Sequence, residues 1–259
     1  MSAVDVDFRL YALTSGTDRR TVEVAGEVAA GGAGVIQVRA KDATTRQLLA
    51  LTIEVARAVA SANPHTRVLV NDRADVAWAA RRAGAAVHGV HLGADDLPPG
   101  DARALLGPEA LIGATAGTPE SVAAANRLAG VVDYLGCGPL RPTPTKDTGR
   151  APVGVAGYLS LVAATELPVI AIGDVQPDDI PSLVAAGVTG VAMLRALNDA
   201  PDPGAVARSV LAAWDAEQTP AGPTSRVLQR QVRHRLSHEP LFGDLGTDGS
   251  TGATPECPP

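Results

Sequence analysis

Short runs of β-branched and aliphatic residues alternate with longer Ala-rich segments along most of the chain. Residues such as Gly, Pro, Asn and Asp bound these short runs, as is typical of buried strands. The longer segments have helical spacing of their apolar residues, and helix-terminating or capping signals such as Gly31-Gly32 and Thr118-Pro119 stand at their ends. The pattern predicts eight strands, at residues 8–14, 35–40, 67–71, 87–92, 110–115, 131–136, 168–173 and 188–194.

A helical segment follows each of these strands, and the last one covers residues 203–216. Eight strand-plus-helix units have the length and rhythm of a (β/α)8 barrel. An open, doubly wound sheet is the alternative, because alternation alone does not show that the sheet closes. We therefore expect an α/β protein with a single TIM barrel over residues 1–216. Residues 217–259 are rich in Pro, Gly, Thr and Ser and are expected to form a largely disordered tail.

Composition narrows the class of protein further. Of 259 residues, 46% are hydrophobic but only 3% aromatic, so the core must be built from Ala, Val, Leu and Ile. The net charge of -6 gives no reason to expect nucleic acid or an anionic membrane as partner. Cys137 and Cys257 have no metal-ligand spacing, and the acidic N-terminus does not resemble a signal peptide. We expect a soluble cytoplasmic protein that acts on small molecules, and a homo-oligomer is possible.

Polar residues at the ends of strands carry the candidate chemistry, because barrel enzymes act at the C-terminal face. Gln37, Arg39 and, if the strand continues, Lys41 point to one face. Two cations on one buried face repel each other unless an anion joins them. Either internal carboxylates neutralise them or the site binds an anionic ligand.

Two carboxylates follow neighbouring strands. Asp72 and Asp96 could meet over the barrel mouth, where a pair of carboxylates with open coordination positions suits Mg²⁺. Asp95 or Asp96 could instead cap the turn before Leu97-Pro98.

His88 and His91 point to opposite faces of their strand, so packing roles are expected for both. Thr115 ends the fifth strand and could offer a hydroxyl to the same mouth.

The passage GCGPLRPTPTKDTG, residues 136–149, is unusual for a connecting loop because its prolines stiffen the backbone while its hydroxyls and lysine stay available to a ligand. Thr143, Thr145 and Lys146 suit an oxyanion. Gly173, Leu194 and Arg195 follow the last two strands, where barrels commonly bind phosphate. Together these groups suit a pyrophosphate handled with Mg²⁺, and a second phosphorylated molecule.

Five motifs stand in order along residues 8 to 215: QVRAK (37–41), VNDRADVA (70–77), HLGADDLP (91–98), GxGPxxPTxTK (136–146) and GVAMLRAL (190–197). In this order and spacing the chain resembles thiamine phosphate synthase. That family is a TIM barrel which joins hydroxymethylpyrimidine diphosphate to a thiazole phosphate and releases pyrophosphate.

The resemblance implies a role for each matching residue. Arg39, Lys41 and Lys146 would be catalytic, and Asp72 and Asp96 would bind Mg²⁺. The pyrimidine diphosphate would be held by Gln37, Val38, Arg39, Ala40, Lys41, Asn71, Thr115 and Lys146. The thiazole phosphate would be held by Thr143, Pro144, Thr145, Gly173, Leu194 and Arg195.

Four positions depart from the family pattern. Asp174 stands where a second Gly is usual, and a carboxylate there would repel phosphate and oppose a positive φ. Arg195 replaces a common Ser and could partly offset Asp174. Arg141 stands where an aromatic is commoner, and Gly117 replaces a frequent His. The alternatives are a thiazole tautomerase of the same superfamily, and a non-catalytic ligand-binding relative in which Asp174 has spoiled the thiazole site.

Overall fold

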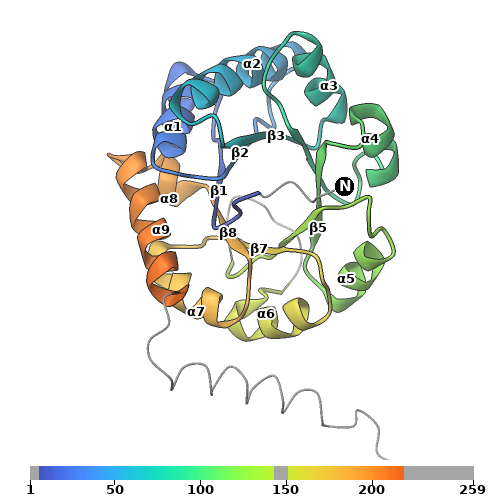
Figure 1. The fold of residues 1–259 in the computed structure, drawn as a ribbon, viewed down its shortest axis with the longest axis vertical. Coiled ribbons are helices and arrows are strands. Elements are labelled where there is room, and N and C mark those ends of the chain that lie inside the picture. The colour runs from blue at the N-terminus through green and yellow to red at the C-terminus, as the bar shows by residue number, and fades with distance from the viewer. Residues whose placement is uncertain (1–5, 143–150, 219–259) are drawn as a thin grey trace, which may run out of the picture. The chain divides into compact units, whose positions relative to one another are not determined.

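Eight parallel strands form a closed barrel in the computed structural model, which describes residues 6–142 and 151–218 (Figure 1). Each strand pairs with its neighbours in sequence, and β1 also pairs with β8, where Leu10 is opposite Val191 and Ala12 is opposite Met193. The strands are β1 (Leu10–Leu13), β2 (Val35–Val38), β3 (Arg67–Asn71), β4 (Gly89–Leu92), β5 (Leu111–Ala116), β6 (Tyr134–Cys137), β7 (Val169–Ile172) and β8 (Gly190–Met193).

Helices form a ring outside the strands (Figure 1). The last helix, α9, contacts α7, α8 and α1. It therefore closes the ring by packing against both the first helix and the preceding ones. The helices are α1 (Arg19–Ala30), α2 (Thr45–Ala62), α3 (Ala74–Arg82), α4 (Pro99–Leu106), α5 (Pro119–Asn126), α6 (Gly154–Ala163), the 3-10 turn η1 (Pro177–Asp179), α7 (Ile180–Ala185), α8 (Arg195–Asn198) and α9 (Pro203–Gln218).

The predicted TIM barrel is confirmed, and the alternative of an open sheet is wrong because β1 and β8 are hydrogen-bonded to each other. Every predicted strand overlaps an observed one, and β5 and β6 each extend one residue beyond the predicted range. The cap signals also hold: the Thr118 hydroxyl accepts a hydrogen bond from the Ser121 amide at the start of α5, and α1 ends at Gly31. Among the described residues, no helix is long and apolar enough to cross a membrane.

The core has two layers. Ala, Val, Leu and Ile dominate the layer between strands and helices, as the composition predicts. A smaller cluster fills the barrel interior and includes the aromatic rings of Phe8, Tyr11 and Tyr134. The ring centroids of Phe8 and Tyr134 are 5.0 Å apart, and those of Tyr11 and Tyr134 are 5.8 Å apart. Two of these rings, Tyr11 and Tyr134, form the floor beneath the C-terminal mouth.

His88 ties two strands together outside the mouth. Its Nδ1 accepts a hydrogen bond from the Val68 amide at 3.0 Å, which confirms a packing role for this histidine. Burial, together with the positive charges of Arg67 and Arg81, lowers the pKa of His88 from 6.5 to about 4. The folded protein therefore keeps this imidazole neutral.

The first prediction concerns this histidine. Because its pKa is lower in the folded chain than in the unfolded one, the stability it contributes is present above about pH 6.5 and is lost as the pH falls through 4. His88→Asn keeps an acceptor for the Val68 amide but does not titrate. We expect urea unfolding at several pH values to show a smaller loss of stability for this variant between pH 6.5 and 4. Equal losses in the variant and the wild type would contradict the prediction.

Candidate active site

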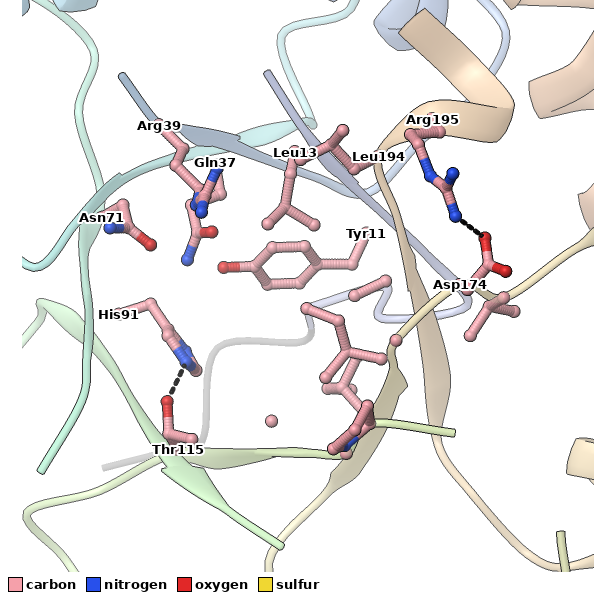
Figure 2. A pocket seen from close by; sticks show the side chains of 18 of the residues that line it. Tyr11, Leu13, Gln37, Arg39, Asn71, His91, Thr115, Asp174, Leu194 and Arg195 are labelled. Atoms are coloured by element: carbon pink, nitrogen blue, oxygen red, sulfur yellow. Dashed lines mark hydrogen bonds and ion pairs between the residues drawn. The ribbon is translucent and has the colours of Figure 1, made fainter. Parts of the chain in front are cut away.

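A pocket opens at the C-terminal ends of the strands, and residues on or directly after all eight strands line it (Figure 2). Because every strand is parallel, all of these ends meet at one face of the barrel. In Figure 2, Gln37, Arg39, Asn71, His91 and Thr115 lie on one side of Tyr11, and Asp174 and Arg195 lie on the other. The pocket thus has a β2–β5 side and a β7–β8 side.

A chain of side-chain hydrogen bonds crosses the floor of the pocket. The hydroxyls of Tyr11 and Tyr134 are 2.9 Å apart. His91 Nδ1 lies 3.0 Å from the Tyr134 hydroxyl, and His91 Nε2 lies 3.1 Å from the Thr115 hydroxyl. Burial raises the pKa of Tyr134 well above its ordinary value, so the phenol stays protonated. The floor therefore presents protonated phenols to a ligand.

Two glycines leave room for the side chains that form these hydrogen bonds. A Cβ at Gly113 would lie 2.1 Å from Cζ of Tyr134, and a Cβ at Gly136 would lie 2.9 Å from Cε1 of His91. No side chain larger than hydrogen fits at Gly113 while the Tyr134 ring stays where it is. The small residues on β5 and β6 thus determine where the polar rings stand.

Arg39 brings a cation into the pocket without a counter-ion. Its guanidinium is half-buried and, among residues 6–142 and 151–218, forms no ion pair. Burial lowers the pKa of Arg39, and the charges of Asp72 and Asp42 partly oppose this shift. Among the described carboxylates, none forms an ion pair with Arg39. A desolvated cation of this kind favours an anionic ligand.

Lys41 does not reach the pocket with Arg39. The strand ends at Val38, so its period-two pattern does not extend to Lys41, which lies exposed in the following turn. Gln37 and Arg39 line the pocket, whereas Val38, Ala40 and Lys41 do not. Thr143, Pro144, Thr145 and Lys146 lie outside the described residues.

The two candidate metal ligands differ in position. Asp72 lines the pocket, and its backbone has a φ of 63° while its amide donates to the His91 carbonyl at 2.8 Å. Asp96 does not line the pocket, and its Oδ2 accepts a hydrogen bond from the Gly93 amide at 2.7 Å, as a turn cap would. Within the described part of the chain, no group of three His, Cys, Asp or Glu side chains could hold a metal ion.

On the β7–β8 side, Gly173, Asp174, Leu194 and Arg195 all line the pocket. Asp174 has a φ of 58°, so the expectation that Asp would exclude a positive φ is wrong. The physical reason is that Asp, with a short polar side chain that can bond locally, is one of the few non-glycine residues to adopt this region. Nη2 of Arg195 donates to Oδ1 of Asp174 at 2.5 Å, which confirms that the one charge offsets the other.

Comparison with known proteins identifies the family. The family model described as thiamine monophosphate synthase matches residues 10–197. A thiamine-phosphate synthase of Corynebacterium jeikeium is 53% identical over 211 residues, which are 82% of this chain and 96% of that protein. One of Corynebacterium efficiens is 53% identical over 206 residues, covering 79% of this chain and 94% of the relative. The chain belongs to the thiamine monophosphate synthase family.

The thiamine monophosphate synthase family is also represented among solved structures. A thiamine phosphate pyrophosphorylase from Pyrococcus furiosus matches with a TM-score of 0.71 at 27% identity, covering 82% of this chain and 98% of the other. The fold and the family assignment therefore agree.

His91, Tyr11 and Tyr134 are pocket residues that the sequence reasoning missed. Tyr11 and Tyr134 lie in predicted strands to which no chemistry is assigned, and the expected role of His91 is packing. The alternation that places Gln37 on the inner face of β2 also places His91 on the inner face of β4, two residues after Gly89. Strand alternation alone could therefore have placed His91 in the pocket. The contacts among Tyr11, His91 and Tyr134 depend on the closed barrel, which the local pattern does not show.

The second prediction compares Tyr134, a tyrosine that lines the pocket of this thiamine monophosphate synthase family member, with a buried tyrosine that does not line it. Tyr134→Phe leaves the Tyr11 hydroxyl and His91 without their shared partner, so stability should fall by about 1–3 kcal/mol. Ligand affinity should fall too, because His91 loses one of the bonds that orient it.

The matched control is Tyr158→Phe. The Tyr158 hydroxyl is also buried and donates to the Cys137 carbonyl at 2.7 Å, but this residue does not line the pocket. We expect thermal unfolding to shift in both variants and turnover to fall only in Tyr134→Phe. Equal turnover in the two variants would show that the chain of hydrogen bonds has no functional role.

Proposed function

We propose that the protein joins 4-amino-2-methyl-5-(diphosphooxymethyl)pyrimidine to 4-methyl-5-(2-phosphooxyethyl)thiazole, giving thiamine phosphate and pyrophosphate in the cytoplasm. Membership of the family supports this reaction. The observation in the structure that carries it is Arg39, a half-buried cation in the pocket with no described counter-ion. Every lining residue falls within residues 11–196, so we assign the activity to the barrel, residues 1–216.

The β2–β5 side suits the pyrimidine diphosphate. Gln37, Asn71 and Thr115 present amide and hydroxyl groups that can bond a neutral heterocycle, above the floor formed by Tyr11 and Tyr134. Arg39 stands beside them, where a diphosphate attached to the ring can reach its guanidinium. We assign Lys41 and Lys146 to the same diphosphate from the resemblance; Lys41 would then have to turn inward from its exposed position.

The reaction needs charge stabilisation and positioning rather than a base. The bond between the pyrimidine methylene carbon and the diphosphate oxygen breaks, and its electron pair leaves with pyrophosphate. The aminopyrimidine delocalises the resulting positive charge. The thiazole nitrogen then donates its lone pair to that carbon, so no proton is transferred. Arg39 would stabilise the negative charge that builds on the leaving oxygen, and the pocket would hold the two rings in line.

Mg²⁺ fits the donors that this side of the pocket offers. Magnesium is commonly held by one or two carboxylates, with waters and substrate phosphates in its other positions. Asp72 lines the pocket, and Asp96, which does not line it, follows the adjacent strand with one oxygen bonded to the Gly93 amide. Asp72 and Asp96 would hold the ion, which when bound supplies positive charge to the diphosphate.

The third prediction tests the reaction itself. A coupled assay should detect pyrophosphate only when both substrates and Mg²⁺ are present, and omission of either substrate should abolish the signal. Pyrophosphate release would exclude the tautomerase, which needs no diphosphate. Binding of substrates without release would favour a non-catalytic relative.

In the same assay, Lys146→Ala should cut turnover by about 100-fold or more, because a cation at the leaving group acts mainly in the transition state, while thermal unfolding changes little. Arg57→Ala removes an exposed cation of α2 and serves as the control. Wild-type turnover in Lys146→Ala would count against the assignment.

The fourth prediction concerns the metal. Chelation by EDTA should abolish pyrophosphate release, and added Mg²⁺ should restore it. Asp72→Asn keeps the size of the side chain and tolerates the positive φ, but removes one ligand charge. The Mg²⁺ concentration for half-maximal rate should rise by about 10-fold or more. Asp101→Asn, an exposed change in the first turn of α4, should leave it unaltered. A shift of equal size in the two variants would remove Asp72 from the metal site.

A further inference from the structure

Three neighbouring helices on one side of the ring carry almost no charge. These are α5, α6 and α7, which follow one another around the barrel (Figure 1). Residues 151–165, which include α6, and residues 180–194, which include α7, contain no Asp, Glu, Lys or Arg. In residues 117–132, which include α5, the charged side chains are Glu120 and Arg127.

The first helix of the ring shows the contrast. On α1, Arg19 pairs with Glu23 at 2.9 Å and Arg20 pairs with Glu27 at 2.8 Å, all on the exposed side of the helix. A single exposed leucine is ordinary on a protein surface. Depletion of charge over neighbouring helices is different, because it is typical of the buried centre of a protein–protein interface.

The middle helix, α6, presents an apolar stripe to the outside. Tyr158 and Leu161 are its buried residues. The exposed residues of the helix follow the helical period and are Ala156, Leu159, Ser160 and Ala163. Leu159 is 48% exposed, the largest fraction among the exposed large hydrophobic side chains of the described residues, and Leu128 after α5 is 37% exposed. In a single chain, water covers this apolar stripe.

The ends of α5 and α6 are bonded to each other. Nδ2 of Asn126 donates to the Ala164 carbonyl at 2.8 Å, and the Thr165 hydroxyl donates to Oδ1 of Asn126 at 2.6 Å. Beside these bonds lies a groove of about 330 Å³, whose lining includes Ala129 and Leu167. The two helices therefore form one preformed surface, with room between them for side chains of a partner.

Two charges of opposite sign stand at the ends of α5. Glu120 lies in its first turn and Arg127 is its C-cap residue, and both are exposed. Within residues 6–142 and 151–218, neither forms an ion pair. A two-fold axis that crosses the helices at right angles would set each helix antiparallel to its own copy. Glu120 of each copy would then face Arg127 of the other, while the uncharged α6 packs on itself.

We propose that the protein forms a homodimer through the α5–α6 face, made of Glu120, Arg127, Leu128, Ala156, Leu159 and Ala163, with α7 at its edge. A second copy suits this face because an uncharged centre with opposite charges at its ends is complementary to itself. The face lies on the outer side of the helix ring, so the mouth of each barrel stays open (Figure 1). The inference does not depend on the proposed reaction.

Sedimentation velocity of the full chain, at concentrations between about 1 and 100 μM, tests the dimer. The wild type should sediment with twice the 26.3 kDa mass of one chain. Leu159→Glu should raise the Kd of the dimer by about 100-fold or more, because the two-fold axis buries the new carboxylate twice without a partner. Leu105→Glu is the matched control: Leu105 is 41% exposed on α4, outside the face, and its replacement should leave the dimer intact.

A charge-swap series tests the antiparallel arrangement. Glu120→Arg alone and Arg127→Glu alone each place like charges opposite each other in the dimer, so the Kd should rise by about 10-fold. The double variant restores opposite charges at both ends and should return the Kd towards the wild-type value. Ala163→Glu, on the same stripe as Leu159, gives a second test of the apolar centre, and thermal unfolding of each variant checks that the fold is retained.

A wild-type chain that stays monomeric at every concentration would overturn the inference. A dimer that both Leu159→Glu and Ala163→Glu leave intact, or that Leu105→Glu disrupts equally, would also overturn it. If the double charge swap fails to recover the dimer lost in the single variants, the two copies do not meet in the antiparallel arrangement.

Discussion

Hydrogen bonding between β1 and β8 closes the sheet, and the position of every pocket residue depends on that closure. Each strand is only four to six residues long and contributes one or two inward side chains near its end. In an open sheet, groups on β2 and β8 would lie far apart. In the closed barrel they face each other across a floor made by Tyr11 and Tyr134, so a single ligand-sized space receives side chains from all eight strands.

Charge is distributed unevenly around that space. The floor is hydrogen-bonded and includes tyrosines that burial keeps protonated. Arg39 is a half-buried cation with no described counter-ion, whereas Arg195 is partly compensated by Asp174. Desolvation makes the first cation costly, so binding of an anion beside Arg39 is favoured.

The two positive-φ residues other than glycine, among those described, are Asp72 and Asp174, and both line the pocket. Such a backbone persists only when its surroundings hold it. The Asp72 amide donates to the His91 carbonyl, and the Asp174 carbonyl accepts from Arg141. Both residues are thereby held at the mouth by contacts that involve neighbouring strands and loops. One of them, Asp72, is a residue to which we assign the metal.

The sequence by itself determined the eight strand-plus-helix units, because hydrophobic period and capping residues are local properties. It also placed Gln37, Asn71 and Thr115 at strand ends, which in a barrel means the mouth. Only the tertiary structure decided that the sheet closes, that β2 ends before Lys41 and that Tyr134 bonds His91 across two strands. These outcomes depend on contacts between residues distant in the chain, whose energies no local pattern encodes.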